Sequence, residues 1–486
     1  MALSRQTCES PLSLGQRQRR AMVVVALCVR LSFLAWYHHG PVIQGGTLIR
    51  HVTIARSLVA GLGFKQDFGQ VSSQILTSRG HEQLFRDPMD WPPISSELGT
   101  PTPSDTVGYA VLLATTWWAT GSQRFLWVQL LQIVLDALTA VALAGIVLQL
   151  TRRRRLASTV GWIWAFFPPA ARIAVNIHRD GFAIWGAVFT LWFILRHVRS
   201  RQWPPLVAAA FAAGVGCWLR PIMLPLAVGL PVAMLLHPGL DRRRVLTGGA
   251  AVLLGAGLVF LAPFMAYNQH TYGRPWAVLS NLATWSNYGE FPNRWGCSIT
   301  DDAAMEYVRS LRYDLTPFSL EWDAVLSRRV DEINAAEPLL MHINAARRFP
   351  QFLVSGFSDV FSFSPDLQIR AWIKGAPDRT LVRYVLENPF VAFVRFGLGP
   401  AFWIPALLGG ALSMRRWREM VVFALAPSWF IFYNIYSHFE NRNVVVGMWG
   451  AVVFFAVAIL WLLDRLLLWR RGEDNPLRDT KPGDAD

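Results

Sequence analysis

Long apolar segments, divided by short polar breaks, run through most of this chain. Of its residues 53% are hydrophobic and 16% are charged, a composition too apolar for a soluble domain of this size. If about 20 apolar residues form one crossing, the sequence predicts an all-α polytopic membrane protein with about ten transmembrane helices. The predicted spans are 21–38, 125–150, 156–175, 181–197, 204–218, 221–237, 245–266, 389–411, 419–436 and 443–464.

Arginine clusters between these spans predict the orientation of the chain. The formal net charge of +14 invites a nucleic-acid interpretation, but the arginines directly follow apolar segments instead of forming one continuous face. Every cluster falls on the same side of the predicted spans, which the positive-inside rule makes cytoplasmic. We therefore expect a multi-pass protein of the cell (inner) membrane, with both termini cytoplasmic and no nucleic-acid partner. The clusters are Arg17 to Arg20, Arg152 to Arg155, Arg196 to Arg201, Arg242 to Arg244, Arg415 to Arg418, and Arg470 with Arg471.

This topology predicts the organisation of the chain and leaves two long polar segments outside. The apolar run 107–121 is too short for a span and ends in Trp117 and Trp118, so we expect an interfacial or re-entrant outer helix with both rings in the headgroup layer. The predicted parts are a cytoplasmic N-terminus 1–20, a transmembrane core 21–266 with a first outer loop 39–124, an outer helical loop 267–388, C-terminal transmembrane helices 389–464 and a cytoplasmic tail 465–486. Within the outer helical loop, 303–312, 320–336 and 338–363 are predicted helices, which would form a small subdomain.

Polar residues at the outer ends of spans are the candidates for chemistry, because such groups are costly near lipid. The sequence has no phosphate-binding glycine loop, zinc motif or serine-hydrolase elbow. The sharpest candidate is the stretch 176–180, which contains His178 and Asp180. A carboxylate flanked by Arg and His stays ionised and can act as a base. The alternative is that Asp180 caps the next helix, and one residue can do both.

Three further stretches at outer boundaries are candidates for substrate contacts. Arg220 precedes Pro221; its planar fork suits phosphate, although the pair could also be a helix break with a snorkelling side chain. The stretch 436–443 offers Arg442 for a second phosphate oxygen, but it could also be an interfacial turn. The stretch 267–290 is rich in amides and aromatics, which suits sugars but is also ordinary in loops. The substrate-binding candidates are His178, Asn287, Tyr288, His438 and Glu440.

Taken in order, these residues resemble the GT-C superfamily of membrane glycosyltransferases, the group of protein O-mannosyltransferases and aminoarabinose transferases. The segment from Gly45 to Phe64 looks like the family's first outer loop, and Gly108 with Tyr109 opens what looks like its juxtamembrane helix. The remaining matches are Asp180 as the second outer acidic residue, Arg220 with Pro221, Asn268, Asn287 to Gly289, and Arg442 as the late arginine. The resemblance implies transfer of a sugar from a polyprenyl-phosphate carrier at the outer membrane face.

The sequence departs from the family at the first-loop aspartate, which the resemblance makes the catalytic base. Thr47 stands near its place, and a threonine hydroxyl does not accept a proton at neutral pH without help. Either another first-loop carboxylate takes over, or Asp180 is the principal acid/base, or the protein is catalytically silent. We favour the first two jointly; the first-loop carboxylates are Asp67, Asp87, Asp90 and Asp105.

The sequence thus predicts a GT-C type hexosyl- or pentosyltransferase of the cell envelope. A carboxylate, Asp180 or a first-loop aspartate such as Asp67 or Asp90, deprotonates or orients the acceptor hydroxyl of a lipid, glycan or protein. Arg220 and Arg442 stabilise the departing lipid phosphate. No cofactor and no metal is expected, because no dense acidic cluster is visible. The alternatives are a transporter or flippase of lipid-linked precursors and a catalytically silent lipid-binding subunit.

Overall fold

The fold is almost entirely helical. The computed structural model describes residues 14–37, 46–67, 87–96, 98–101, 107–275, 308–315, 320–354, 357, 393, 397–436 and 441–470. In this part of the chain, β-structure is limited to a short antiparallel pair, β1 (Gln66–Asp67) and β2 (Leu98–Gly99).

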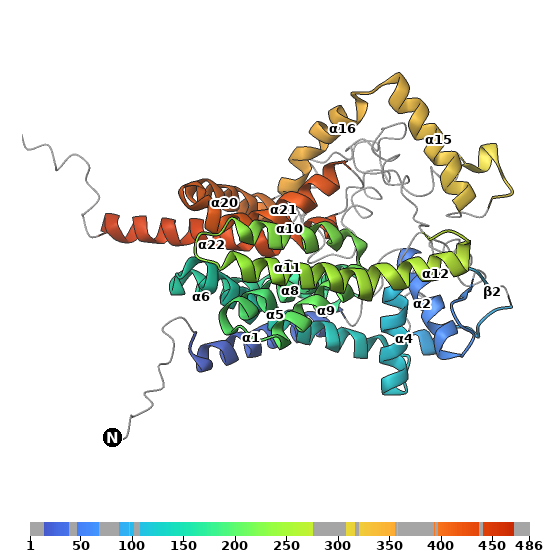
Figure 1. Cartoon of the computed structure of the whole chain (residues 1–486), viewed down its shortest axis with the longest axis horizontal. Helices are drawn as coiled ribbons and strands as arrows, with labels where there is room; N and C mark the ends of the chain where they lie inside the picture. Colours follow the sequence, from blue (N-terminus) through green and yellow to red (C-terminus); the bar gives the residue numbers. More distant parts are fainter. Residues whose placement is uncertain are drawn as a thin grey trace, which may run out of the picture.

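The predicted spans coincide with helices of an elongated bundle where the structure describes them (Figure 1). Of the predicted span 389–411, residues 389–392 and 394–396 lie outside the described residues. Two spans are interrupted where proline removes a backbone donor: one divides into α6 (Arg154–Phe166) and α7 (Pro168–Val175), and another has the short helix η3 (Pro221–Met223) before α10 (Leu224–Leu235). The others are α1 (Gln16–Tyr37), α5 (Phe125–Thr151), α8 (Asp180–Ser200), α9 (Pro204–Leu219), α11 (Arg242–Gly255) continuing through η4 (Ala256–Leu261) into α12 (Ala262–Tyr272), α20 (Leu398–Leu412), η7 (Met414–Arg416) with α21 (Trp417–Tyr436), and α22 (Asn441–Arg470).

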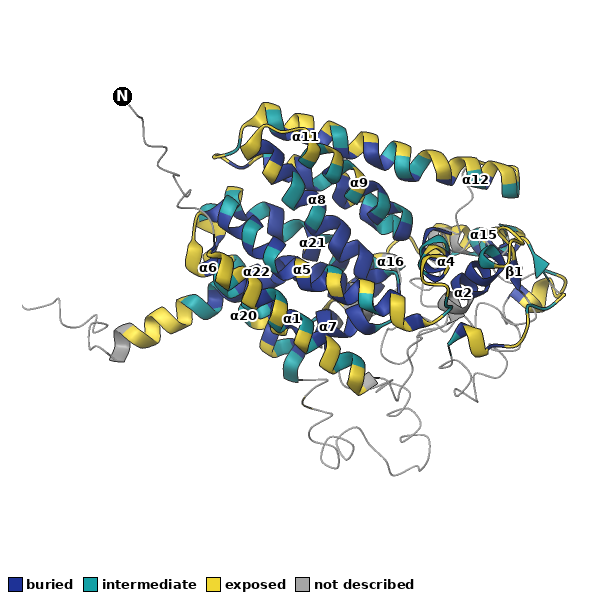
Figure 2. Cartoon of the chain, turned by 90° about the horizontal axis from the view of Figure 1, so that it is seen from below, coloured by how far each residue is buried: buried dark blue, intermediate teal, exposed yellow. Residues whose placement is uncertain are grey.

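Several of these helices have the length and apolarity of membrane spans. Within the described residues, five are long and apolar enough to cross a membrane: Phe125–Thr151, Asp180–Ser200, Arg242–Tyr272, Met414–Tyr436 and Val444–Leu467. Pro204–Leu219, Pro221–Leu235 and Leu398–Leu412 are apolar but shorter. Helix α11 lies at the edge of the bundle and shows many exposed residues (Figure 2). Among the exposed residues of α11 and η4 are leucines, for example Leu254 at 65% and Leu258 at 71%. Exposed apolar side chains of this kind suit contact with lipid, and the predicted class, an all-α polytopic membrane protein, is confirmed.

The basic clusters gather at one end of the bundle. Arg155 at the start of α6 pairs with Asp464 near the end of α22, with 2.6 Å between Nη1 and Oδ1. At the same end, Arg244 of α11 donates from Nη1 to the carbonyl of Val198, near the end of α8, at 2.8 Å. The opposite end carries α2 (Gly46–Val59), α4 (Gly108–Thr120) and the β-pair (Figure 1).

Helix α4 runs across the direction of the bundle helices (Figure 1), as expected for an interfacial helix. Its two tryptophans differ: Trp118 is 81% exposed, whereas Trp117 is buried and packs near Phe125. The expectation that both rings lie in the headgroup layer is therefore wrong for Trp117, because consecutive helical residues point in different directions.

The segment 267–388, predicted as an outer helical loop, is helical over most of the residues from 308 onward that the structure describes. Residues 308–311 are helical, followed by α15 (Leu320–Ala336), α16 (Leu340–Arg348) and the short helix η5 (Phe349–Val354). His342 of α16 lies with Nδ1 3.4 Å from the hydroxyl of Tyr436, the last residue of α21. The segment therefore contacts the bundle at the end of α21 opposite to Arg418.

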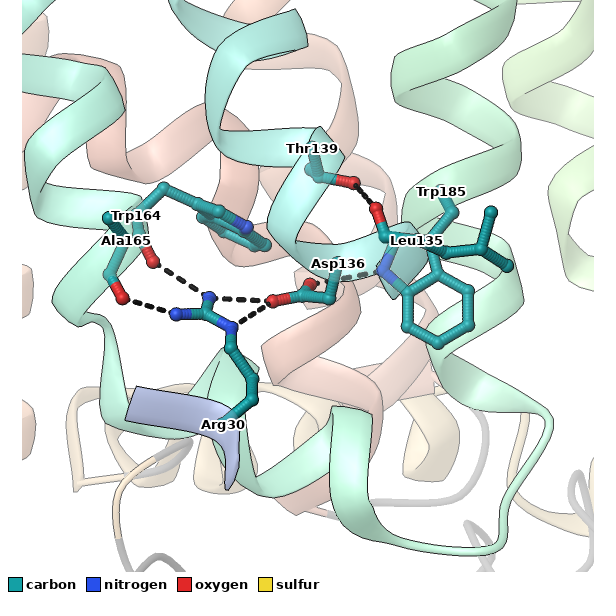
Figure 3. A network of polar contacts seen from close by, with 7 residues as sticks. All are labelled: Arg30, Leu135, Asp136, Thr139, Trp164, Ala165 and Trp185. Atoms are coloured by element: carbon teal, nitrogen blue, oxygen red, sulfur yellow. Dashed lines mark hydrogen bonds and ion pairs between the residues drawn. The ribbon is translucent and has the colours of Figure 1, made fainter. Parts of the chain in front are cut away.

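A buried charge cluster fixes the break between α6 and α7. Pro168 and Pro169 have no N–H groups to donate to the carbonyls four residues earlier, those of Trp164 and Ala165. The guanidinium of Arg30 replaces both donors, with Nη2 2.8 Å from the oxygen of Trp164 and Nη1 bonded to the oxygen of Ala165 (Figure 3). A backbone interruption inside a bundle is thereby satisfied from another helix.

Asp136 of α5 completes this cluster. Its Oδ2 accepts from Nε of Arg30 at 2.7 Å, and its Oδ1 accepts from the indole of Trp185 at 3.0 Å (Figure 3). Both charged side chains are fully buried. The pair joins α1, α5, α6 and α8, and so holds the segment that leads into the candidate site.

Candidate functional site

The turn between α7 and α8 carries the candidate residues and is held by two glutamines of α5. A helix leaves its last carbonyls without partners inside the helix. Gln129 donates to the carbonyl of Val175 at 2.7 Å, and Gln132 donates to those of Ala174 and Asn176 at 3.1 and 2.6 Å. The end of α7 is thereby fixed against α5, and the chain enters α8 in a defined position.

Close packing of α8 on α9 sets the second side of the site. A Cβ atom on Gly186 would lie 3.0 Å from the Cα atom of Gly216, and one on Gly216 would lie 3.2 Å from the Cα atom of Gly186. Glycines allow such helices to approach closely. Because the two helices are consecutive and antiparallel, the start of α8 lies beside the end of α9.

This packing brings together three residues that the sequence predicted. Asp180, at the first position of α8, has Oδ1 2.9 Å from Nε of Arg220 and Oδ2 2.9 Å from Nδ1 of His178. The side chain of Asp180 is 2% exposed, and those of His178 and Arg220 are 9% and 11% exposed. The arrangement is a carboxylate between a guanidinium and an imidazole, and the start of α8 adds a favourable helix dipole.

Helices α2 and α4 border this cluster. His51 of α2 has Nε2 3.5 Å from Nη1 of Arg179, and its ring centroid lies 5.6 Å from that of Tyr109 of α4. The hydroxyl of Tyr109 donates to Oε1 of Gln132 at 3.3 Å. Burial raises the pKa of Tyr109 well above its usual value, and the charge of Asp180 adds to the rise, so the phenol stays protonated.

The first-loop carboxylates that the structure describes have other roles. Asp67 accepts a bond from the backbone N–H of Ser95 at 2.8 Å and another from its hydroxyl, which ties β1 to the segment before β2. Asp87 accepts the N–H of Phe125 at 2.9 Å and so caps α5. Asp90 is exposed in the short helix η2 (Pro88–Asp90). The structure thus groups neither Asp67 nor Asp90 with the described contacts of Asp180, and both remain predictions as catalytic groups.

The remaining predicted residues are not placed. Asn287, Tyr288, His438, Glu440 and Asp105 lie outside the described residues. Arg442 belongs to the first turn of α22, but its side chain is outside the described part. His51, Gln132 and the place of Tyr109 in the site were not predicted from the sequence. The signal for Gln132 was available: two glutamines three residues apart in an apolar span lie on one face of a helix.

No set of three or more His, Cys, Asp or Glu side chains is close enough to hold a metal ion within the described ranges. His178 and Asp180 are a pair, and the third member of their cluster is an arginine. A carboxylate, an imidazole and a guanidinium at these distances can transfer a proton and bind an anion.

Comparison with known proteins finds no family. No protein-family model and no curated protein matches the sequence. The apo crystal structure of the Archaeoglobus fulgidus oligosaccharyltransferase is similar with a TM-score of 0.46 and 12% identity, covering 94% of this chain and 52% of that one. The archaeal oligosaccharyltransferase AglB from Archaeoglobus fulgidus, in complex with an inhibitory peptide and a dolichol-phosphate, gives a TM-score of 0.46 and 12% identity over 96% and 52%. The chain spans about half the length of these proteins, and a likeness of this size assigns no family.

Proposed function

We propose that this chain is a membrane glycosyltransferase that moves a sugar from a polyprenyl-phosphate-linked donor to a lipid, glycan or protein acceptor. The observation that carries the proposal is the buried contact of Asp180 with Arg220 and His178 at one end of the bundle. The resemblance of the sequence to GT-C enzymes supports it independently, since both elements that meet here, the 176–180 stretch and Arg220 with Pro221, belong to that pattern.

Arg220 binds the lipid phosphate in this proposal. Its contact with Asp180 is made through Nε, one of the five N–H donors of a guanidinium. The carboxylate holds the planar group in one orientation, so that its other edge can face a phosphate with two parallel donors. Negative charge develops on the phosphate as the sugar leaves, and a fixed arginine stabilises it without reorganisation. Arg442 is the second proposed phosphate ligand.

The site faces the outside in this proposal. By the positive-inside rule, the arginine clusters at the other end of the bundle support a cytoplasmic location for that end, together with the start of α1 and the end of α22. Donor and acceptor then meet at the outer boundary of the membrane, bordered by α2 and α4. We propose the cell membrane as the location and both termini as cytoplasmic.

Transfer of a labelled sugar from undecaprenyl-phosphate donors to a membrane acceptor extract tests the proposal. We expect turnover by the purified wild-type protein and a loss of about 100-fold or more in both Asp180→Asn and Arg220→Ala. Asp464→Asn is the matched control, because it makes the same substitution in an ion pair with arginine at the opposite end of the bundle. Absence of wild-type turnover across a broad donor panel would contradict the proposal and favour the transport or silent lipid-binding alternatives.

A further inference from the structure

Three turns meet at the arginine-rich end of the bundle. The turn between α10 and α11 contacts the end of α5, because Nε2 of His237 lies 2.8 Å from the carbonyl oxygen of Leu150. The same turn contacts the end of α8 through Arg244, whose Nη1 donates to the carbonyl of Val198 at 2.8 Å. We call the joined region the three-turn surface; it consists of residues 150–154, 198–203 and 237–244.

Most arginines of this surface have no carboxylate partner. Arg244 pairs with Asp241, with Nε 3.0 Å from Oδ2, and Arg155, directly after the first turn, pairs with Asp464. An arginine outside such a pair can offer two parallel N–H donors to a phosphate. Within the residues that the structure describes, seven exposed arginines of the surface form no ion pair: Arg152, Arg153, Arg154, Arg199, Arg201, Arg242 and Arg243.

The backbone at two of these arginines favours a use for their side chains. Arg152 follows α5 with a φ of 57°, and Arg201 follows α8 with a φ of 61°. This left-handed region is crowded for any residue with a Cβ atom, and helices that end in it normally do so with glycine. Glycine would end both helices at a lower backbone cost, so the two arginines are better explained by what their guanidinium groups bind.

Exposed apolar side chains lie next to the arginines on α9. Trp203 is 70% exposed and stands two residues after Arg201. Val207 and Phe211 follow it at intervals of four residues and are also exposed, so the three side chains lie on one face of the helix. A tryptophan between arginines and an apolar face is typical of the boundary between headgroups and acyl chains.

Helix α11 has the same order of groups as α9. The two helices pack directly, since the carbonyl of Ala210 leaves no room for a Cβ atom on Gly255. Arg242 lies in the first turn of α11, and Leu246 and Leu254 further along are exposed. Both helices therefore begin at the three-turn surface with arginine and continue with apolar side chains, which matches the phosphate and acyl chains of a phospholipid.

We propose that the three-turn surface binds an anionic phospholipid of the leaflet at this end of the bundle. Arg201, Arg242 and Arg243 bind the headgroup phosphate, and the acyl chains lie along the exposed faces of α9 and α11. Positive charge favours an anionic over a zwitterionic headgroup, and the apolar faces favour a lipid over a soluble anion. The inference goes beyond sugar transfer and does not depend on it, because the surface lies at the opposite end of the bundle from Asp180.

Thermal unfolding of the delipidated protein in a non-ionic detergent tests the proposal. The additions are phosphatidylglycerol, phosphatidylcholine with the same acyl chains, and inorganic phosphate at the same concentration. A ligand that binds the folded state raises the unfolding midpoint. We expect a rise of about 2–4 °C with phosphatidylglycerol, reduced at high salt, and a much smaller change with the other two. Equal shifts from both lipids, or from phosphate alone, would overturn the proposal.

Arg201→Gly separates lipid binding from folding. Glycine relieves the crowded backbone at this position, so the midpoint without lipid should rise by about 1 °C. The shift with phosphatidylglycerol should nevertheless fall by half or more, because a guanidinium is lost. An arginine that only ends α8 predicts no loss of the lipid shift, so a full shift in the folded variant would contradict its assignment to the lipid.

The double variant Arg242→Gln with Arg243→Gln should also lose most of the lipid shift. Its matched control is Arg19→Gln with Arg20→Gln, since both of these arginines are exposed at the start of α1. Figure 2 shows α1 and α11 on opposite sides of the bundle. An equal loss of the shift in the control would assign the effect to the general positive charge of this end and overturn the site. Sugar transfer measured on the same preparations reports on the proposed function separately.

Discussion

Two buried Arg–Asp pairs lie in this bundle, and they differ in what surrounds them. Arg30 and Asp136 are completely buried, and their described bonds run to each other, to two carbonyls and to an indole. Arg220 and Asp180 lie at the end of the bundle, where Asp180 also contacts a titratable imidazole and Arg220 keeps 11% of its side chain exposed.

The partners of the two pairs show how a buried charge with a structural use can be told from one with a proposed functional use in a membrane protein. A buried charge in a span is a functional candidate by default, and a transporter interpretation would begin with Arg30 and Asp136. The partners of Arg30, however, include the carbonyls of Trp164 and Ala165, whose usual helical donors the double proline removes, which is a structural use. Arg220 and Asp180 lie instead in a cluster that α2 and α4 border through His51 and Tyr109, and the proposed function makes this cluster the substrate site.

The largest expected effect is a loss of stability when the pair of Arg30 and Asp136 is broken. Arg30→Met leaves Asp136 buried without its ion partner and removes the donors to Trp164 and Ala165. Loss of one member of a buried pair costs about 3–5 kcal/mol. We expect a marked decrease in the thermal unfolding midpoint of the detergent-solubilised protein. The double variant Arg30→Met with Asp136→Leu should recover part of it, and an unchanged midpoint in the single variant would remove the contrast between the two pairs.

Arg220→Lys alters the pair of Arg220 and Asp180 without removing its positive charge. Lysine keeps the positive charge near Asp180 but loses the planar fork that suits a phosphate. We expect transfer activity to fall about 100-fold, with a smaller loss of stability than in Arg30→Met, since the side chain is at the edge of the bundle. The measurement is kcat and the donor KM together with the unfolding midpoint. Wild-type transfer by Arg220→Lys would show that the fork is not used.

Substitution of Asp67 tests whether the first outer loop supplies a base. Asp67→Asn weakens the two bonds from Ser95, which should cost about 1–2 kcal/mol. We expect transfer to stay within a few-fold of wild type after matching for folded protein. A collapse of transfer with the fold intact would place the catalytic base in the loop that carries Asp67.

The smallest expected effect is at the exposed pair of Arg155 and Asp464, whose side chains are 58% and 54% exposed. An ion pair in contact with water contributes about 0–1 kcal/mol. Asp464→Asn should therefore leave transfer unchanged and move the unfolding midpoint slightly, with less difference from wild type in high salt. A large loss in stability would show that position along the bundle, and not burial, decides the strength of these pairs.

The helices could be predicted from the sequence, because each depends on a local pattern. Apolar runs predicted all the main bundle helices, and the short run ending in Trp117 and Trp118 predicted α4. The 176–180 stretch and Arg220 were also identified as candidates, since polar groups at span ends stand out against their surroundings.

The partners of these residues could not be predicted. The contact of Asp180 with Arg220 depends on the close approach of Gly186 and Gly216, a packing detail that the sequence does not reveal. Arg30 was noticed as an interruption of an apolar run, but its partner Asp136 lies 106 residues away. In the same way, the hydrogen bonds from Ser95 to Asp67 depend on the conformation of a loop, which no local sequence pattern predicts.

The double-proline break has a consequence for the biosynthesis of the protein. Arg30 leaves the ribosome with the first helix, but the carbonyl of Trp164 that it satisfies is made 134 residues later. A lone arginine is costly at the centre of a bilayer, so we expect the first helix to stay beside the insertion machinery until α5 and α6 arrive. Nascent chains stopped after residue 120 should then be extracted from membranes at alkaline pH more readily than chains stopped after residue 200, and Arg30→Leu should remove this difference. We therefore expect the timing of membrane insertion to depend on the contacts of Arg30 with Trp164, Ala165 and Asp136.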